Sequence, residues 1–271
     1  LQGIMGGYFA EAQGFEKEVC LSISEHYLPV GLDSKVPKNP YSISLSLSDK
    51  LDTLVGFFGL DLIPTGSRDP YALRRNAIAL VRLIVENKIS IKLRSIINYS
   101  LTLYKDQGYE FDITKILKEL NNFILERLKN YSKEKNIRLD IIESSMLSND
   151  IDDIYKGYKK AEVLNRNIKK EIGQDVVGIY KRSSNILKSE ISKSNLELSN
   201  SVDTGLFKNE FEKNLYKKIQ EVKKYFANLD KNDNFEDSLN ELLKFKQDVN
   251  SFFDNVKVND ENELIKKNRL E

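Results

Sequence analysis

The sequence has 271 residues, 40% of them hydrophobic, and its 42 basic and 41 acidic side chains give a formal net charge of +1. This balance excludes a uniformly basic nucleic-acid coat, so any RNA contact must come from a local patch. Cys20 is the one cysteine, which excludes a disulfide framework and indicates a reducing compartment such as the cytoplasm. No apolar run reaches about 18 residues, so we expect no membrane contact.

The first 92 residues hold all five prolines and most of the glycines. Helices are predicted at 16–27 and 41–58, with a proline-bearing loop between them. The rest of the chain is more polar and has long apolar periods. This change of composition predicts a module boundary near residues 90–105, and the hydrophobic share is large enough for two ordinary cores.

The segment 63–75, IPTGSRDPYALRR, predicts the end of one helix, a turn and the start of another. Pro64 cannot donate to a helical ladder, and Gly66 supplies turn geometry. Asp69 is predicted to cap the next helix and Pro70 to occupy its first position.

The arginines of this segment allow two interpretations. Guanidinium groups suit phosphate, which would make Arg68, Arg74 and Arg75 an RNA contact. Consecutive arginines, however, point about 100° apart on a helix. We favour ion pairs of Arg74 or Arg75 with Asp69 or Glu86.

Apolar residues from 113 to 131 recur at helical spacing, and Asp112 is predicted to cap that helix. Two shorter helices are predicted at 139–147 and 151–163. A bundle follows, with helices predicted at 174–191, at 207–229, at 235–256 and from 261. Because no stretch alternates convincingly at period two, the predicted fold class is all-α.

Residues 166–193 carry seven basic and three acidic side chains. Because the net charge of the whole chain is close to zero, this local basic patch is where an RNA contact is expected. One predicted helix in it offers a stacking ring, two cations and an amide, the mixture that recognises single-stranded RNA loops. A solvated lysine-rich face is the alternative explanation. The candidate RNA-binding residues are Arg166, Lys169, Lys170, Tyr180, Lys181, Arg182 and Asn185.

Residues 230–271 carry eleven acidic and seven basic side chains, so we do not expect the main RNA surface there. Their apolar side chains recur at helical spacing. We expect this segment to close the bundle through a core made of Phe245, Val249, Phe252 and Phe253.

Several blocks of the sequence occur in one known family. Besides 63–75 they are LQGIMGGYFA at the start, EHYLP at 25–29, SDKLDTLVGFFG at 48–59, YKRSSNIL at 180–187, VDTGLF at 202–207 and FFDNVKVNDENELIKKNRLE at 252–271. Together, and in this order, they resemble the beta subunit of bacterial heterotetrameric glycyl-tRNA synthetase. Since Leu1 already lies inside a block, we expect the chain to be a C-terminal fragment of a longer protein.

The resemblance implies the C-terminal part of an HD-like helical domain at 1–105, a helical linker at 106–150 and a bundle at 151–271. That bundle is similar to the anticodon-binding domain of arginyl-tRNA synthetase. The resemblance further implies that the chain binds and orients glycine tRNA. A partner alpha subunit, in an assembly of two alpha and two beta subunits, would carry the site for glycylation with ATP and Mg. No catalytic residue or cofactor is expected in this chain.

The resemblance to HD proteins also raises an enzymatic alternative. His26, with Asp49 and Asp52, would supply the metal ligands of an HD-type phosphohydrolase. We expect a remnant without metal, because the sequence has no adjacent His-Asp pair and a hydrolytic metal site needs several ligands. A third hypothesis is a non-catalytic helical scaffold that binds a protein through the helix at 112–131.

Overall fold

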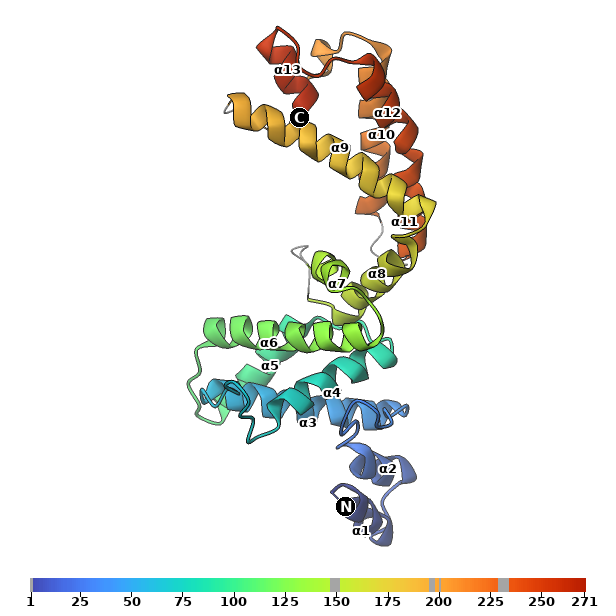
Figure 1. Ribbon diagram of the computed structural model, residues 1–271. Helices are drawn as coiled ribbons and strands as arrows, with labels where there is room; N and C mark the ends of the chain where they lie inside the picture. The colour runs from blue at the N-terminus through green and yellow to red at the C-terminus, as the bar shows by residue number, and fades with distance from the viewer. Residues whose placement is uncertain (1, 147–151, 195–197, 200, 229–233) are drawn as a thin grey trace. The chain divides into compact units, whose positions relative to one another are not determined.

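The computed structural model describes residues 2–146, 152–194, 198–199, 201–228 and 234–271. Every regular element in these ranges is a helix, so the predicted all-α class is confirmed (Figure 1). None of these helices is long and apolar enough to cross a membrane. The described residues exclude the predicted helix ends at 147, 151 and 229, and the side chain of Lys193 in the basic patch also lies outside the description.

The chain divides within α8 into two compact units, Leu1–Glu162 and Val163–Glu271. The three-part division predicted from the sequence stays a prediction. The helices that begin in the first unit are α1 Ile4–Ala12, α2 Lys17–Glu25, α3 Pro40–Gly59, α4 Leu73–Glu86, α5 Leu93–Asp106, α6 Ile113–Glu134, α7 Leu139–Met146 and α8 Ile154–Asn167.

Helix α4 lies at the centre of the first unit, in contact with α3 and α6 (Figure 1). Its side chains are apolar over most of its circumference, and this is typical of a helix covered on several sides. The predicted cap of α6 is confirmed, because the Asp112 carboxylate accepts a hydrogen bond from the Lys115 amide at 3.0 Å. The side chains of α4 that are fully buried are Leu73, Ala77, Leu80, Val81, Leu83 and Ile84.

In the turn before α4, Asp69 binds the first backbone amides of the helix, but the helix begins later than predicted. The Asp69 carboxylate accepts hydrogen bonds from the amides of Leu73 at 2.9 Å and Arg74 at 3.0 Å, so it satisfies the first amides of the helix, although the N-cap residue is Ala72 and not Asp69 as predicted. The helix, however, begins only at Leu73, and Ala72 before it is left-handed at φ 57°. The predicted position of Pro70 in the first helical turn is therefore wrong.

The ion pairs favoured for Arg74 and Arg75 are also wrong. Asp69 is occupied by backbone amides, and the Glu86 carboxylate pairs with Arg82 at 2.8 Å. The guanidinium of Arg74 donates instead to the carbonyl of Gly66 at 2.6 Å.

Two glycines of α3 are required by packing. A Cβ at Gly56 would collide with the hydroxyl of Tyr104, and one at Gly59 would collide with the ring of Phe111. The Tyr104 hydroxyl donates to the carbonyl of Asp52 at 3.1 Å. Burial and the nearby Asp52 carboxylate raise the pKa of Tyr104 to about 12. The VGFFG part of the sequence is thus explained by aromatic rings that pack directly on the helix backbone.

The second unit contains a short 3₁₀ turn, η1 Thr204–Leu206, among its helices. Helix α9 packs against α11 and α12, and α10 packs against α12 (Figure 1). The single helix predicted at 235–256 is divided at Phe245. Of the predicted core, Val249 and Phe252 are buried, whereas Phe245 and Phe253 are half-buried. The α-helices are α9 Glu171–Ser194, α10 Glu210–Ala227, α11 Phe235–Lys244, α12 Lys246–Asn255 and α13 Glu263–Leu270.

Candidate nucleic-acid interface

One face of α9 is exposed along almost its whole length. Its residues lie three or four positions apart, which places their side chains in one row on the helix. The row contains amide, hydroxyl and lysine side chains and no carboxylate, so it offers hydrogen-bond donors and positive charge. Its members are Gln174, Gly178, Lys181, Asn185, Lys188 and Ser192.

Tyr180 lies beside this row and is 70% exposed. An aromatic ring so open to solvent contributes little to the fold, but it is available for a base to stack on. Lys181 and Asn185, one turn apart in the row, supply a cation and an amide next to it. The structure therefore keeps three of the predicted residues on one accessible part of α9.

Arg182 faces a different direction. Two residues along a helix correspond to a rotation of about 200°, so Arg182 lies nearly opposite Tyr180. Its guanidinium pairs with Asp254 at 2.9 Å and lies 4.9 Å from the ring centre of Phe253, both on α12. Arg182 thus contacts the acidic C-terminal part of the unit.

The other three candidates precede the exposed row. Arg166, near the end of α8, lies 3.9 Å from Glu236, and both side chains are about half exposed. Lys170 donates to the side chain of Asn167 at 3.1 Å, and Lys169 is exposed. These residues add positive charge at the start of α9, but their role in binding stays a prediction.

Gly178 and Gln174 were not among the contacts predicted from the sequence. No atom lies within 4 Å of the point where a Cβ at Gly178 would be, so nothing inside the unit requires a glycine there. Glycine inside a helix costs about 0.5–1 kcal/mol relative to alanine. A bare stretch of backbone in the exposed row lets a ligand approach closely. A glycine within an otherwise amphipathic helix was the signal that could have found it.

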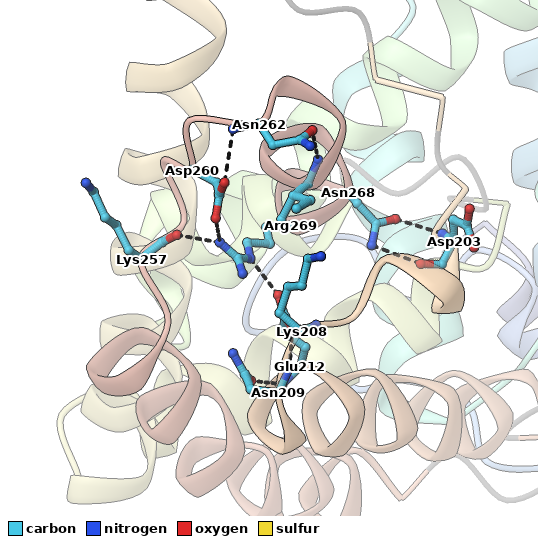
Figure 2. Close-up of polar contacts among 10 residues, drawn as sticks. Asp203, Lys208, Asn209, Glu212, Lys257, Asp260, Asn262, Asn268 and Arg269 are labelled. Carbon is cyan, nitrogen blue, oxygen red and sulfur yellow. Dashed lines mark hydrogen bonds and ion pairs between the residues drawn. The ribbon is translucent and has the colours of Figure 1, made fainter.

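The C-terminal segment is tied to the start of α10 through one arginine (Figure 2). Arg269 donates to the Glu212 carboxylate at 2.5 Å, to the Asp260 carboxylate at 2.7 Å and to the Lys257 carbonyl at 2.9 Å. The side chains of Arg269 and Glu212 are only 7% and 4% exposed. Glu212 also closes a capping box with Asn209 at the start of α10.

Burial alone would raise the pKa of the Glu212 carboxyl. Hydrogen bonds from Arg269 and from the amides of Lys208 and Asn209 outweigh burial and hold this pKa below its ordinary value.

Two further contacts fasten α13. Lys266 pairs with Glu190 of α9 at 3.1 Å, and Asn268 exchanges hydrogen bonds with the backbone of Asp203 (Figure 2). The acidic end therefore closes the unit by buried polar contacts as well as by apolar ones.

The three residues of the predicted HD remnant lie in the first unit with partners of their own. His26 Nδ1 donates to the carbonyl of Ile23 at 2.6 Å. The buried Lys50 ammonium pairs with Asp49 at 2.8 Å and donates to the His26 carbonyl at 2.9 Å. The side chain of Asp52 is exposed. Within the described ranges, no three His, Cys, Asp or Glu side chains are grouped so that they could hold a metal ion.

Comparison with known proteins assigns the exposed helix to a class. Residues 177–271 match the DALR anticodon binding domain. This segment contains most of α9, with Tyr180, Lys181 and Asn185, and the helices packed against it. The segment 177–271, which makes up most of the second unit, is accordingly similar to an anticodon binding domain.

Residues 1–147 match the glycyl-tRNA synthetase beta subunit family. The chain belongs to this family, and the resemblance noted from its sequence blocks is confirmed. The glycine–tRNA ligase beta subunits of Sulfurihydrogenibium sp. (strain YO3AOP1) and Rickettsia typhi (strain ATCC VR-144 / Wilmington) are 37% and 36% identical to it over 270 residues. That of Clostridioides difficile (strain 630) is 34% identical over 271 residues. Each alignment covers 100% of this chain but only 36%, 38% and 38% of the respective relative.

Proposed function

We propose that this chain is the tRNA-recognising part of a glycine–tRNA ligase beta subunit. It binds a glycine tRNA and orients it for glycylation at the active site of an alpha subunit, in an assembly of two alpha and two beta subunits in the cytoplasm. ATP and Mg act at that partner. The chain itself contributes binding energy and orientation rather than an acid, a base or a nucleophile.

The observation that carries this proposal is the exposed row of α9 with Tyr180 beside it. Apart from Gln174, the row lies inside the segment that matches an anticodon-binding family. It combines an open aromatic ring, lysine charge and amide groups, which together suit unpaired bases better than a regular duplex.

The scaffold hypothesis loses its basis in the structure. That hypothesis assigned protein binding to the apolar stripe of α6. This stripe is buried inside the first unit against α4 and its neighbours. Ile116 is 2% exposed, and Leu120, Ile124 and Leu128 are fully buried. Ile113, at the start of the stripe, is 50% exposed, but the residues that follow are covered, so α6 presents no continuous apolar face to another protein.

A titration with matched tyrosine variants tests the proposal. Replacing Tyr180→Ala should weaken binding of glycine tRNA by about 1–3 kcal/mol, because one stacked base loses its platform. Tyr99→Ala is the control, since Tyr99 is similarly exposed at 67% but lies on α5 in the first unit. Binding would be followed by fluorescence anisotropy at several salt concentrations.

The same titration should be repeated with tRNAs altered in the anticodon. Wild-type chain should bind them more weakly than the intact tRNA, and Tyr180→Ala should reduce that difference. An affinity that is indifferent to both salt and the anticodon would sink the proposal. If Tyr180→Ala and Tyr99→Ala lose equal affinity for glycine tRNA, α9 is not the binding surface.

A further inference from the structure

Arg127 on α6 is a charged side chain without a polar partner. Its Nε atom is buried, and it makes no hydrogen bond or ion pair with any residue that the structure describes. The guanidinium lies 5.1 Å from the ring centre of Phe123, one turn earlier on the helix. A buried donor that has lost water without gaining an acceptor is costly, most of all when it carries charge.

A second arginine lies nearby. Arg74 is in the first turn of α4, the helix that packs against α6. Burial, together with the positive charge of Arg74, lowers the pKa of the Arg127 guanidinium. Arg74 uses one nitrogen to donate to the Gly66 carbonyl at 2.6 Å. Two positive groups are therefore held close together by the packing of two helices.

The carboxylates near this pair are already engaged. Asp69 accepts from two backbone amides at the start of α4. Glu126 pairs with Lys129 at 2.8 Å. The side chains of Arg68 and Arg75, in the same block of sequence, are exposed and add further positive charge. Asp69 and Glu126 offset the positive charge of Arg127 only in part, because burial and Arg74 still leave the pKa of its guanidinium lowered.

We propose that Arg74 and Arg127 together bind a phosphate group of a nucleic-acid backbone, which gives the first unit its own tRNA contact. Guanidinium groups donate paired N–H bonds that match the oxygens of a phosphate, and a phosphate between the two arginines removes their repulsion. The buried Nε stays out of reach of this phosphate, which accepts from the other guanidinium nitrogens of the half-buried Arg127 side chain. This inference rests on the proposed tRNA-binding function, but it concerns residues outside the anticodon-binding match.

The test uses the full chain and the variant Arg127→Met, which keeps an unbranched apolar stem against Phe123. Affinity for glycine tRNA should fall on the order of ten-fold at low salt, as expected for a lost hydrogen bond between charged groups. The slope of log Kd against log salt should fall by about one, equally for intact and anticodon-altered tRNAs. Arg127→Lys should recover only part of the affinity, because it restores the charge without the planar fork.

Lys118→Met is the matched control. Lys118 is an exposed cation nine residues earlier on α6, so its side chain projects from the opposite side of the helix, about 180° away. The Lys118→Met substitution removes one positive charge, as Arg127→Met does, and should leave the tRNA affinity and the salt slope unchanged. The melting temperature without RNA separates a binding role from a structural one. Arg127→Met should melt close to the wild-type temperature, since it loses only the contact of the guanidinium with the Phe123 ring and keeps an apolar stem there.

Three results would overturn the inference. The first is an Arg127→Met variant that binds tRNA like the wild type while anticodon discrimination persists, which leaves the proposed function intact. The second is a lower melting temperature of Arg127→Met together with a loss of tRNA affinity that is equally large for Lys118→Met. The third is stabilisation of the wild type by inorganic phosphate or ATP that Arg127→Met abolishes without any change in RNA affinity. That result would assign the site to a small phosphate compound. A wild-type chain that fails to bind tRNA at all would overturn both proposals.

Discussion

The two units of this protein bury different kinds of side chain. Among the described residues, the largest fully buried side chains, such as Phe58, Leu80 and Ile124, all lie in the first unit. In the second unit, the buried apolar residues keep a few per cent of exposure, and the lowest value is 3% at Val249. That unit encloses two ion pairs in which both side chains are buried, Lys266 with Glu190 and Arg269 with Glu212. The first unit also buries two paired cations, Lys50 and Arg82, but their partners Asp49 and Glu86 are 37% and 27% exposed.

The difference shows how a small unit with a long polar helix can still be closed. Apolar burial tolerates small shifts, because it is non-directional and scales with area. A buried ion pair requires good geometry and complete hydrogen bonding, since desolvation of both charges must be compensated. The second unit should therefore depend on a few specific contacts, and the first on the sum of many.

The largest expected effect comes from breaking the Arg269 contacts. Arg269→Met leaves Glu212 as a buried charge without its partner, which should cost the second unit about 3–5 kcal/mol. Hydrogen exchange of the α10 to α13 amides measures this loss locally, while the amides of α4 should be unaffected.

The exposed pair of Arg138 and Asp140 in the first unit serves as the control. Both side chains are more than half exposed, so Arg138→Met should change little. Comparable losses in the two variants would show that burial of the Arg269 pair is not what matters.

Acid should affect the second unit more than the first. The folded pKa of Glu212 lies below its ordinary value, so its stabilising contribution is complete above the unfolded pKa of about 4.3. It is lost as the pH falls through the folded pKa. The melting temperature of Glu212→Gln should therefore lie below that of the wild type at pH 7. The gap between them should close below about pH 4.3, and a gap that stays constant with pH would contradict this account.

A smaller effect is expected where a side chain is added in the first unit. Gly59→Ala places a methyl group against the Phe111 ring, and overpacking of this kind costs about 1–3 kcal/mol. Denaturant unfolding would measure it. The double variant Gly59→Ala with Phe111→Leu should recover part of the loss, because the smaller side chain makes room for the methyl group.

The smallest effect should have the opposite sign. Gly178→Ala meets no atom within 4 Å, so it should stabilise α9 by about 0.5–1 kcal/mol through the better helix propensity of alanine. If the bare backbone at this point receives tRNA, the same variant should bind more weakly while melting at a higher temperature. A destabilised variant would show that α9 packs differently from the structure described above.

Local patterns were sufficient to predict the all-α fold, the cap at Asp112 and the core positions Val249 and Phe252. They failed where a tertiary contact decides. Nothing before α4 signals that Ala72 takes a left-handed conformation, which is normally a role for glycine. The division of 235–256 at Phe245 has no proline or glycine to announce it.

The candidate interface also has some features that the sequence could predict and others that only tertiary contacts decide. The exposure of Tyr180, Lys181 and Asn185 could be expected from the polar face of one amphipathic helix. The direction of Arg182 could not, because helical spacing does not say which neighbour an arginine will meet. Arg127 gave no local signal at all, since its significance lies in the acceptor it lacks, and only the packing of α4 on α6 reveals that. The binding roles of all these residues remain predictions for the experiments above.

The contacts of Arg269 and Lys266 also constrain the order in which the second unit can form. Glu212 precedes Arg269 by 57 residues, and Glu190 precedes Lys266 by more. On a ribosome, α9 and α10 therefore emerge with carboxylates that must wait for their cations. Until α13 leaves the exit tunnel, closing these helices would bury unpaired charge. We expect the first unit to acquire its native structure during translation, and the second unit to mature only after α13 has emerged.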